Sequence, residues 1–391
     1  MTPHKTPNWF EKNPKKTIFI IVISIFVGCI FGSEKYFAMR NRKTFVNPIY
    51  YLRYIALRES PPLMADYFTP SEEDQKDQDS LVIKKYKFRI DKNGFIVPSE
   101  KYAHPDLSIV FLGGSTTECM YVDEENRFPY LAGCLLEKEC HLKINSYNGG
   151  VGGNNSLHSL DNLLNKVLPL HPKIVLMMHN INDLSILLYE KTYWNNNPYK
   201  CVIVTEDHGV VSLTRIVVKK FIPNLYRQIL QIVNIRKLIR TAEYGDEFEV
   251  IRSKKVAYDR DEIMKNYGEN LDLFIAICKT KKIIPVLMTM ASRITQHPDK
   301  LILQCFRKAN EAGLSYAEYK GLFDGFNEVM RQKAKEHNIP LIDLARDIPP
   351  TREYIYDLAH YNDNGSRQAA AIIAAHLKPL ISQSQGNPAH H

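Results

Sequence analysis

Residues 107–117, Leu-Ser-Ile-Val-Phe-Leu-Gly-Gly-Ser-Thr-Thr, join an apolar run to a Gly-Gly-Ser turn. An unbroken apolar run of this length is typical of a strand that is buried on both faces of a parallel sheet. The two glycines allow a sharp turn, and the residues after them are expected to begin a helix. Ser115 is therefore predicted at the C-terminal edge of a sheet, where open α/β folds bind their ligands.

Four later apolar runs repeat this pattern, and amphipathic stretches separate them. The predicted strands are residues 107–112, 144–147, 173–178, 283–288 and 339–344, and the predicted helices are residues 128–138, 155–166, 261–281, 316–337 and 364–380. This alternation indicates a parallel sheet of about five strands covered by helices on both faces. We assign it to one domain at residues 107–383, followed by a disordered tail at 384–391.

The alternation stops between about residues 190 and 258, which we interpret as an insertion. Residues 193–197 are aromatic and asparagine-rich, a composition found both in sugar-binding faces and in ordinary loops. Residues 209–241 then carry seven Lys and Arg, no Asp or Glu, and apolar residues at helical spacing. Such a helix either packs on its own domain with its basic side chains in water, or lies on a membrane surface or beside a substrate channel.

Near the N-terminus, residues 17–32 read TIFIIVISIFVGCIFG and carry no charge. This segment is slightly shorter than the stretch of about 20 residues that spans a bilayer, and aromatic residues flank it on both sides. We interpret it as a transmembrane anchor that follows a short basic tail at residues 1–16. A buried helix, a cleaved signal peptide and a lipoprotein signal at Cys29 are the alternatives.

Of the net charge of +8, +6 lies within residues 1–43, so the charge flanks the apolar segment and does not indicate nucleic-acid binding. Basic residues lie on both sides of the segment and do not fix its orientation. A short basic tail usually stays in the cytosol, which would place the domain in a periplasm or lumen. The seven cysteines form no CxxC pair and no dense framework, so they do not decide the compartment.

Residues 33–106 are interpreted as a juxtamembrane linker and lead-in. The polar run at residues 71–80, SEEDQKDQDS, is expected to be a loop. Residues 86–95 alternate polar and apolar side chains and end on Asn93-Gly94, which predicts a strand closed by a turn.

Three more motifs complement Ser115. Residues 149–153, Gly-Gly-Val-Gly-Gly, follow the second predicted strand, Asn182 follows the third, and Asp357 precedes His360 by three residues. Three residues apart on one helical turn, Asp357 and His360 would face the same side. An ester-cleaving enzyme needs a nucleophile, a base, a group that orients the base, and donors for the oxyanion. The four motifs together supply these groups.

Each motif also has a purely structural interpretation. Residues 115–118, Ser-Thr-Thr-Glu, fit a helix capping box, and a glycine run fits a flexible turn. Asn182 is an ordinary turn or cap residue, and a solvated His360 beside Asp357 needs no catalytic role. The sequence contains no HExxH, CxxC or Walker pattern, so no motif predicts a metal or nucleotide site.

The four motifs resemble the conserved blocks of the SGNH/GDSL hydrolase superfamily, over residues 86–380 apart from the insertion. The resemblance implies a flavodoxin-like three-layer α/β/α fold and no metal or organic cofactor. It makes Ser115 the nucleophile, His360 the base and Asp357 its acidic partner, with the backbone of Ser115, Gly153 and the Asn182 amide as the oxyanion hole. The chain departs from the usual blocks in two places, with Gly114 in the place of an Asp and Asn180 in the place of a Gly.

The resulting expectation is a membrane-anchored serine esterase that works through an acyl-enzyme. An O-acyltransferase that modifies an envelope glycan or lipid uses the same groups and stays open, because only water exclusion and an acceptor site separate the two activities. A non-catalytic envelope protein that binds glycan or lipid is the alternative from another class. The expected partners are an acyl ester and the membrane; the sequence does not set the oligomeric state.

Overall fold

The computed structural model describes residues 9–44, 51–197, 200–207, 256–309 and 313–386. The chain divides into two compact units, one of residues 1–54 and 204–236 and the other of residues 55–203 and 237–391. The second unit contains every residue of the predicted site.

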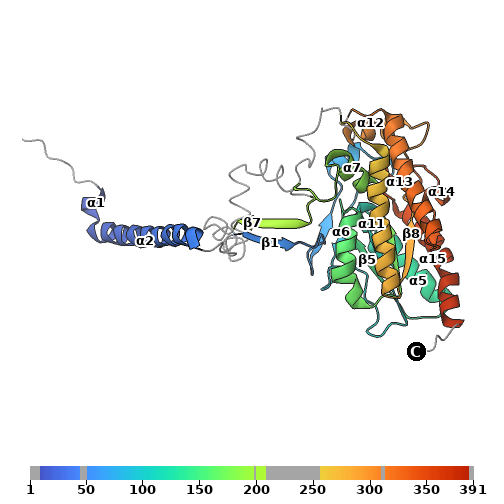
Figure 1. Cartoon of the computed structure of the whole chain (residues 1–391), viewed down its shortest axis with the longest axis horizontal. Helices are drawn as coiled ribbons and strands as arrows, with labels where there is room; N and C mark the ends of the chain where they lie inside the picture. Colours follow the sequence, from blue (N-terminus) through green and yellow to red (C-terminus); the bar gives the residue numbers. More distant parts are fainter. Residues whose placement is uncertain (1–8, 45–50, 198–199, 208–255, 310–312, 387–391) are drawn as a thin grey trace, which may run out of the picture. The chain divides into compact units, whose positions relative to one another are not determined.

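A five-stranded parallel sheet forms the centre of the second unit (Figure 1), in the order β5-β4-β6-β8-β9. The strands are β4 (Leu107–Gly113), β5 (Ile144–Gly150), β6 (Ile174–Met178), β8 (Ile284–Met288) and β9 (Leu341–Ile342). The second strand along the chain lies outside the first, as in flavodoxin-like sheets. The predicted parallel sheet of about five strands is confirmed. All of β4 except Ser108 is buried, as the unbroken apolar run predicts.

Helices cover the sheet in two groups. One group contains α5 (Phe128–Cys140) and α15 (Asp363–Gly386), and the other contains α6 (Ser156–Asn162), α7 (Ile181–Tyr189), α11 (Arg260–Thr280) and α13 (Tyr316–Glu336). Two shorter helices, α12 (Lys300–Ala309) and α14 (Leu344–Asp347), complete the unit. This arrangement confirms the three-layer α/β/α fold, since each amphipathic helix buries its apolar face on the sheet or on a neighbouring helix.

Two helical segments differ from the prediction. The helix expected at residues 155–166 ends at Asn162 and continues as a wider turn at Leu163–Val167 and a tight one at Leu168–Leu170. Helix α7 is not among the predicted helices, because Asn182 near its start also fits a turn. In both places polar or proline residues weaken the apolar periodicity that marks a helix in sequence.

Residues 55–106 of the lead-in are part of the second unit. Strand β2 (Ala65–Phe68) pairs antiparallel with β3 (Tyr86–Arg89), which lies in the predicted strand. The polar run expected as a loop instead contains helix α3 (Glu72–Lys76). Ser71 and Asp74 form a capping box there, each side chain accepting a hydrogen bond from the other's backbone N–H. A polar helix of this kind has no apolar periodicity to reveal it.

Buried Arg127 joins the lead-in to the segment after Ser115. Its guanidinium donates to the carbonyl oxygens of Lys87, Val97 and Cys119 at 2.8, 3.0 and 3.2 Å. Two of these carbonyls, those of Lys87 and Val97, belong to the lead-in, and that of Cys119 lies just after Ser115. A buried guanidinium that satisfies three backbone acceptors fixes them relative to one another.

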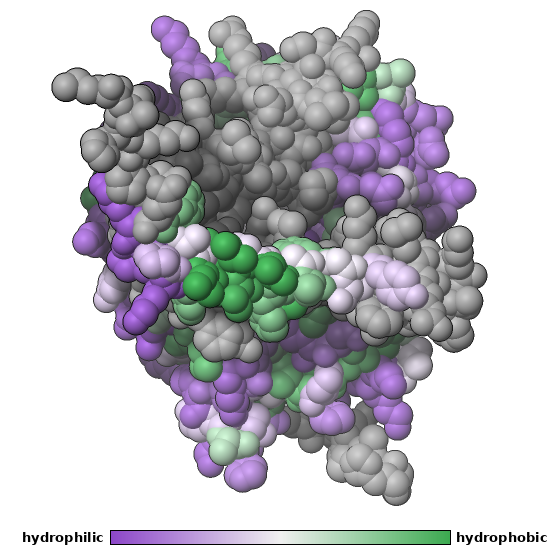
Figure 2. All heavy atoms as spheres, turned by 90° about the vertical axis from the view of Figure 1, so that its left-hand side faces the viewer, coloured by the Kyte–Doolittle hydropathy of each residue, from purple (hydrophilic) through white to green (hydrophobic). Residues whose placement is uncertain are grey.

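The first unit contains helices α1 (Trp9–Lys12) and α2 (Pro14–Thr44), and strand β1 (Tyr51–Ile55) pairs with β7 (Ile203–Asp207). Residues 14–33 of α2 have the length and composition of a membrane span or of a signal sequence, and none of that window is buried. Hydrophobic side chains lie open on the face that Figure 2 shows, and those of α2 are among the exposed hydrophobic residues.

Part of the predicted insertion lies outside the described residues, including the basic helix expected within residues 209–241. Residues 1–8 of the basic tail and 387–391 of the C-terminal tail lie outside them too. The start of the insertion is described. Tyr193 is buried there and donates its hydroxyl hydrogen bond to Asp183 at 2.7 Å, whereas Trp194 is exposed. Tyr193 is therefore a core residue, and Trp194 is the aromatic residue of this pair that a ligand can reach.

Candidate active site

Ser115 is the first residue of helix α4 (Ser115–Glu118), directly after strand β4. The residue that caps the helix is Gly114, and no side chain makes a capping hydrogen bond. Ser115 is therefore not the capping residue of a capping box, and its Oγ lies 2.7 Å from Nε2 of His360. A Cβ atom at Gly114 would lie 2.6 Å from Nδ2 of Asn182. Glycine at this position permits the close approach of Asn182 to the strand end.

Asp357 and His360 are in contact, with Oδ2 of the carboxylate 2.6 Å from Nδ1 of the imidazole. The expectation that they share a helical turn is wrong, because residues 356–360 belong to the loop between α14 and α15. The other carboxylate oxygen of Asp357 accepts the backbone N–H groups of Ala359 and His360 at 3.0 and 2.8 Å. An Asp that bonds to the backbone just after it builds a turn of its own, which brings the side chains together without a helix.

The charges of the pair shift both pKa values. Burial works to raise the pKa of Asp357, but the charge of His360 and the hydrogen bonds to the carboxylate outweigh burial and lower it. For His360, burial works to lower the pKa, and the charge and hydrogen bond of Asp357, with Glu118 and Asp74, raise it above its usual value. The His360 side chain keeps 34 % of its surface exposed, so solvent moderates this shift. The ring of Tyr356 stacks on the imidazole, with centroids 5.7 Å apart.

The predicted oxyanion donors lie around Gly114. Gly153 has φ of +77°, in the left-handed region that favours glycine. Asn182, the second residue of α7, donates from Nδ2 to the carbonyl oxygen of Asn154 at 2.9 Å. Because Asn182 also borders Gly114, its amide connects the end of β4 with the loop that contains Gly153. The structure thus brings Ser115, Gly153 and Asn182 to one edge of the sheet.

Two cationic side chains bind the loop that contains Gly152 and Gly153, and neither belongs to a sequence motif. Nζ of Lys200 donates to the carbonyl oxygen of Gly153 at 2.8 Å, and Nη2 of Arg58 donates to that of Gly152 at 3.5 Å. Lys200 is only 2 % exposed. A Cβ atom at Gly153 would lie 3.0 Å from Nζ of Lys200 and 3.4 Å from Nη2 of Arg58. The two cations therefore pack directly on the glycine, where a side chain would displace them.

A pocket of about 280 Å³ opens beside Ser115 and His360. The other residues that line it are Asp74, Asp77, Thr116, Glu118, Cys119, Met120, Tyr121, Tyr356, Asp357 and Tyr361. Asp74 and Asp77 come from the lead-in, which therefore forms one wall of the candidate active site. A larger cavity of about 810 Å³ lies near the N-terminal ends of β4, β6 and β8, and no predicted site residue lines it.

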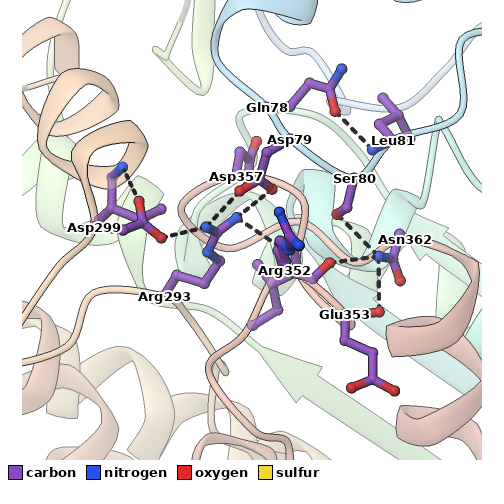
Figure 3. A network of polar contacts seen from close by, with 12 residues as sticks. Gln78, Asp79, Ser80, Leu81, Arg293, Asp299, Arg352, Glu353, Asp357 and Asn362 are labelled. Carbon is purple, nitrogen blue, oxygen red and sulfur yellow. Dashed lines mark hydrogen bonds and ion pairs between the residues drawn. The ribbon is translucent and has the colours of Figure 1, made fainter.

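Arg293 ties the lead-in to the loop that carries His360 (Figure 3). Its guanidinium forms two hydrogen bonds to the carboxylate of Asp79, at 2.7 and 2.8 Å, and one to Asp299 at 2.5 Å. It also donates to the carbonyl oxygen of Ile355 at 3.3 Å, and its backbone N–H donates to that of Leu358 at 2.9 Å. Nearby, the Asn362 amide donates to Oγ of Ser80 at 3.2 Å. The loop of Asp357 and His360 is thus fixed from two sides.

A second Ser-His-Asp arrangement lies in the core. Oγ of Ser159 lies 2.7 Å from Nε2 of His179, and Nδ1 of His179 lies 3.6 Å from Asp183. All three side chains are buried, and burial lowers the pKa of His179. None of the three lines the pocket beside Ser115. Asp183 also accepts the backbone N–H of Ser156 and the hydroxyl of Tyr193. This arrangement supports packing, because no substrate reaches it.

Two other polar residues of the motifs have structural partners. The Asn148 amide donates to the carbonyl oxygen of Thr117, and that of Asn180 donates to the carbonyl oxygen of Phe323. Within the described ranges, no group of three or more His, Cys, Asp or Glu side chains is arranged to hold a metal ion.

Comparison with known proteins identifies the family. The sequence profile of the GDSL-like lipase/acylhydrolase family matches residues 111–368, a range that contains every residue of the predicted site. No curated protein matches the chain. Similar solved structures include Axe2, an acetylxylan esterase from Geobacillus stearothermophilus, with 14 % identity, a TM-score of 0.42, and coverage of 70 % of this chain and 94 % of that one. Another is a lipase/acylhydrolase from Enterococcus faecalis, with 16 % identity, a TM-score of 0.39, and coverage of 70 % and 96 %.

The profile match spans more than half of the chain and confirms the resemblance that the motifs indicate. The chain therefore belongs to the GDSL-like lipase/acylhydrolase family, and this membership supports an ester-hydrolysing enzyme.

Proposed function

We propose that the chain is a serine esterase whose catalytic triad is Ser115, His360 and Asp357. One observation carries the proposal: Oγ of Ser115, the imidazole of His360 and the carboxylate of Asp357 are joined by contacts of 2.7 and 2.6 Å beside an open pocket. A serine hydroxyl is a weak nucleophile near neutral pH and needs an adjacent base, which this geometry supplies.

The chemistry proceeds in two halves. Oγ of Ser115 attacks the ester carbonyl while its proton passes to Nε2 of His360, and the tetrahedral oxyanion forms. His360 then gives the proton to the leaving alcohol oxygen, and an acyl-enzyme remains on Ser115. Water attacks this acyl group, His360 accepts its proton and returns it to Oγ, and the carboxylic acid departs. Asp357 holds the imidazole in the tautomer with the proton on Nδ1 and stabilises the imidazolium.

The oxyanion is stabilised by donors that are in place before the reaction. We assign this role to the backbone N–H groups of Ser115 and Gly153 and to the amide of Asn182. The Asn182 amide has a second hydrogen besides the one bonded to Asn154. Lys200 and Arg58 bind the carbonyl oxygens of Gly153 and Gly152. The N–H and C=O groups of a peptide bond point in opposite directions, so these contacts favour an N–H of Gly153 that points away from Arg58.

We also propose that α2 anchors the enzyme in a membrane, with the second unit on the extracytoplasmic side. The exposed apolar surface of α2 and the short basic tail before it support this topology. A reporter that is active only outside the cytosol, fused after residue 391, should be active. Activity of a cytosolic reporter at that position would contradict the topology.

Turnover of defined esters by the full chain in detergent tests the proposed reaction. Short-chain and long-chain acyl esters and acetylated sugars are incubated with the chain, with and without an added alcohol, and both the acid and any new ester are measured. Release of acid that depends on Ser115 is the expected result. Formation of a new ester in place of acid would identify the O-acyltransferase. Binding of a glycan or lipid without any turnover would identify a non-catalytic protein.

A further inference from the structure

Glu118 is a buried carboxylate at the pocket that the proposed reaction does not use. It is the last residue of α4, one helical turn after Ser115, and it is 5 % exposed. It lines the pocket together with Ser115 and His360. Its Oε2 lies 3.2 Å from the place that a Cβ of Gly152 would take, so the carboxylate packs against the loop before Gly153.

This carboxylate has few polar partners. The carboxylate packs against the backbone of Gly152, and across the described part of the chain it forms no ion pair. Burial raises the pKa of Glu118 to about 7, although the N–H of Gly152, the charge of His360 and that of Arg127 work against the rise. A buried carboxylate without a cation destabilises the fold. A packing role alone would be filled better by an apolar side chain.

The rest of the pocket wall defines what Glu118 can bind. Asp74 and Asp77 add two more carboxylates, and among the described residues no Lys or Arg lines the pocket. An ionised carboxylate only accepts hydrogen bonds, so its ligand must be a donor. An anionic ligand so close to Asp74, Asp77 and Glu118 would be repelled, because charges interact more strongly in a partly buried site than in water.

We propose that Glu118 recognises the substrate: it accepts a hydrogen bond from a hydroxyl or ammonium group that the ester carries near its scissile carbonyl. By the same chemistry the pocket rejects esters that bear a carboxylate or phosphate at that place. This inference rests on the proposed function, since it takes Ser115 as the nucleophile. It narrows the substrates to neutral hydroxylated or cationic esters.

Esters matched in size test the proposal on the acyl side. The p-nitrophenyl esters of butanoate, 3-hydroxypropanoate, 3-aminopropanoate and succinate place a methyl, hydroxyl, ammonium or carboxylate group at similar distances from the carbonyl. On the alcohol side, propyl acetate, 2-hydroxyethyl acetate and 3-acetoxypropanoate place a methyl, hydroxyl or carboxylate group at similar distances from the ester oxygen. The full chain is assayed at pH 8, above the raised pKa of Glu118, and each rate is corrected for spontaneous hydrolysis.

On at least one side, kcat/KM for a hydroxyl or ammonium ester should exceed that for the methyl ester by about tenfold to a hundredfold, as expected for a hydrogen bond to a charged group. The carboxylate ester should be the poorest. The ammonium ester distinguishes the two kinds of donor. If the ligand group is a cation, its kcat/KM should exceed that of the hydroxyl ester, because the charge adds to the hydrogen bond. Glu118→Gln keeps the shape of the side chain and should reduce the ratio of donor to methyl ester to within about threefold, since only a neutral hydrogen bond remains.

Glu124→Gln is the matched control. Glu124 is also buried, but it is ion-paired with Arg89 at 2.9 Å and does not line the pocket. Its substitution should leave the ratios as in the unchanged chain. Equal rates for methyl and donor esters, or a Glu118→Gln variant that keeps the original ratios, would overturn the role of Glu118 while the esterase proposal stands. A chain whose Ser115 resists covalent labelling and that cleaves no ester would overturn the esterase proposal, and this one with it.

Discussion

Arg293 and Asp79 form a two-pronged ion pair, with both carboxylate oxygens bonded to the guanidinium at 2.7 and 2.8 Å. The two residues are 214 positions apart in the chain. The pair joins the lead-in, which forms one wall of the pocket, to the loop that carries Asp357 and His360. The lead-in is therefore part of the candidate active site as well as the stretch of chain between α2 and the sheet.

Arg293→Met should reduce kcat by about tenfold to a hundredfold, because a small displacement of the base is sufficient for such a loss. The methionine keeps the apolar stem but loses the bonds to Asp79 and Asp299. Turnover is measured well below the unfolding temperature of the variant. Arg331→Met removes a similar two-pronged pair with Asp343, away from the pocket, and should lower stability without a comparable loss of kcat. Equal losses of kcat would contradict a role of Arg293 in placing His360.

Asp357→Asn should reduce kcat by up to about 10⁴-fold while the chain stays folded. The amide no longer fixes the tautomer of His360 and no longer stabilises the imidazolium.

The dependence of kcat/KM on pH is a second measurement on the same variant. His360 acts as a base only when neutral, so kcat/KM should rise as pH increases through the raised pKa of His360. Without the charge of Asp357 that pKa falls, and the rise should move to lower pH. An unchanged profile would show that Asp357 does not act on the base.

Asn182→Ala should lower kcat by about 10²- to 10³-fold, which corresponds to roughly 2.7–4 kcal/mol, with a small effect on KM. The variant loses one oxyanion donor but leaves Ser115 and His360 in place. Asn180→Ala is an informative comparison, because its amide bonds to Phe323 and Asn327 in the core. That variant should lower the unfolding temperature more than kcat. A large loss of kcat in Asn180→Ala with little loss in Asn182→Ala would assign the oxyanion donor to Asn180.

Removal of residues 1–43 should give a soluble protein that retains ester cleavage. This truncation deletes nearly all of α2, whose membrane-span window is not buried, and leaves every candidate catalytic residue. Solubility without detergent and kcat/KM for a short-chain ester are the measurements. Aggregation of the truncated protein together with loss of activity would show that the helix belongs to the folded core.

The sequence predicts the sheet and the four motifs because both have local signatures. Apolar runs mark buried strands, and the strand end places Ser115. The spacing of Asp357 and His360 predicts contact but not its cause, since three residues fit both a helical turn and an Asx-type turn. Arg58, Lys200 and Arg293 could not be predicted. Their partners are 94, 47 and 214 positions away in the chain, and a lone cation in sequence gives no indication of which carbonyl or carboxylate it meets.

Covalent labelling with a fluorophosphonate probe, followed by identification of the modified peptide, tests the central claim most directly. The core contains a second serine, Ser159, at the same 2.7 Å distance from a histidine as Ser115, but Ser159 is buried away from the pocket and should not react. The account predicts a label on Ser115 in the unchanged chain and in Ser159→Ala, and none in Ser115→Ala. A label that persists in Ser115→Ala, or one found on Ser159, would contradict it.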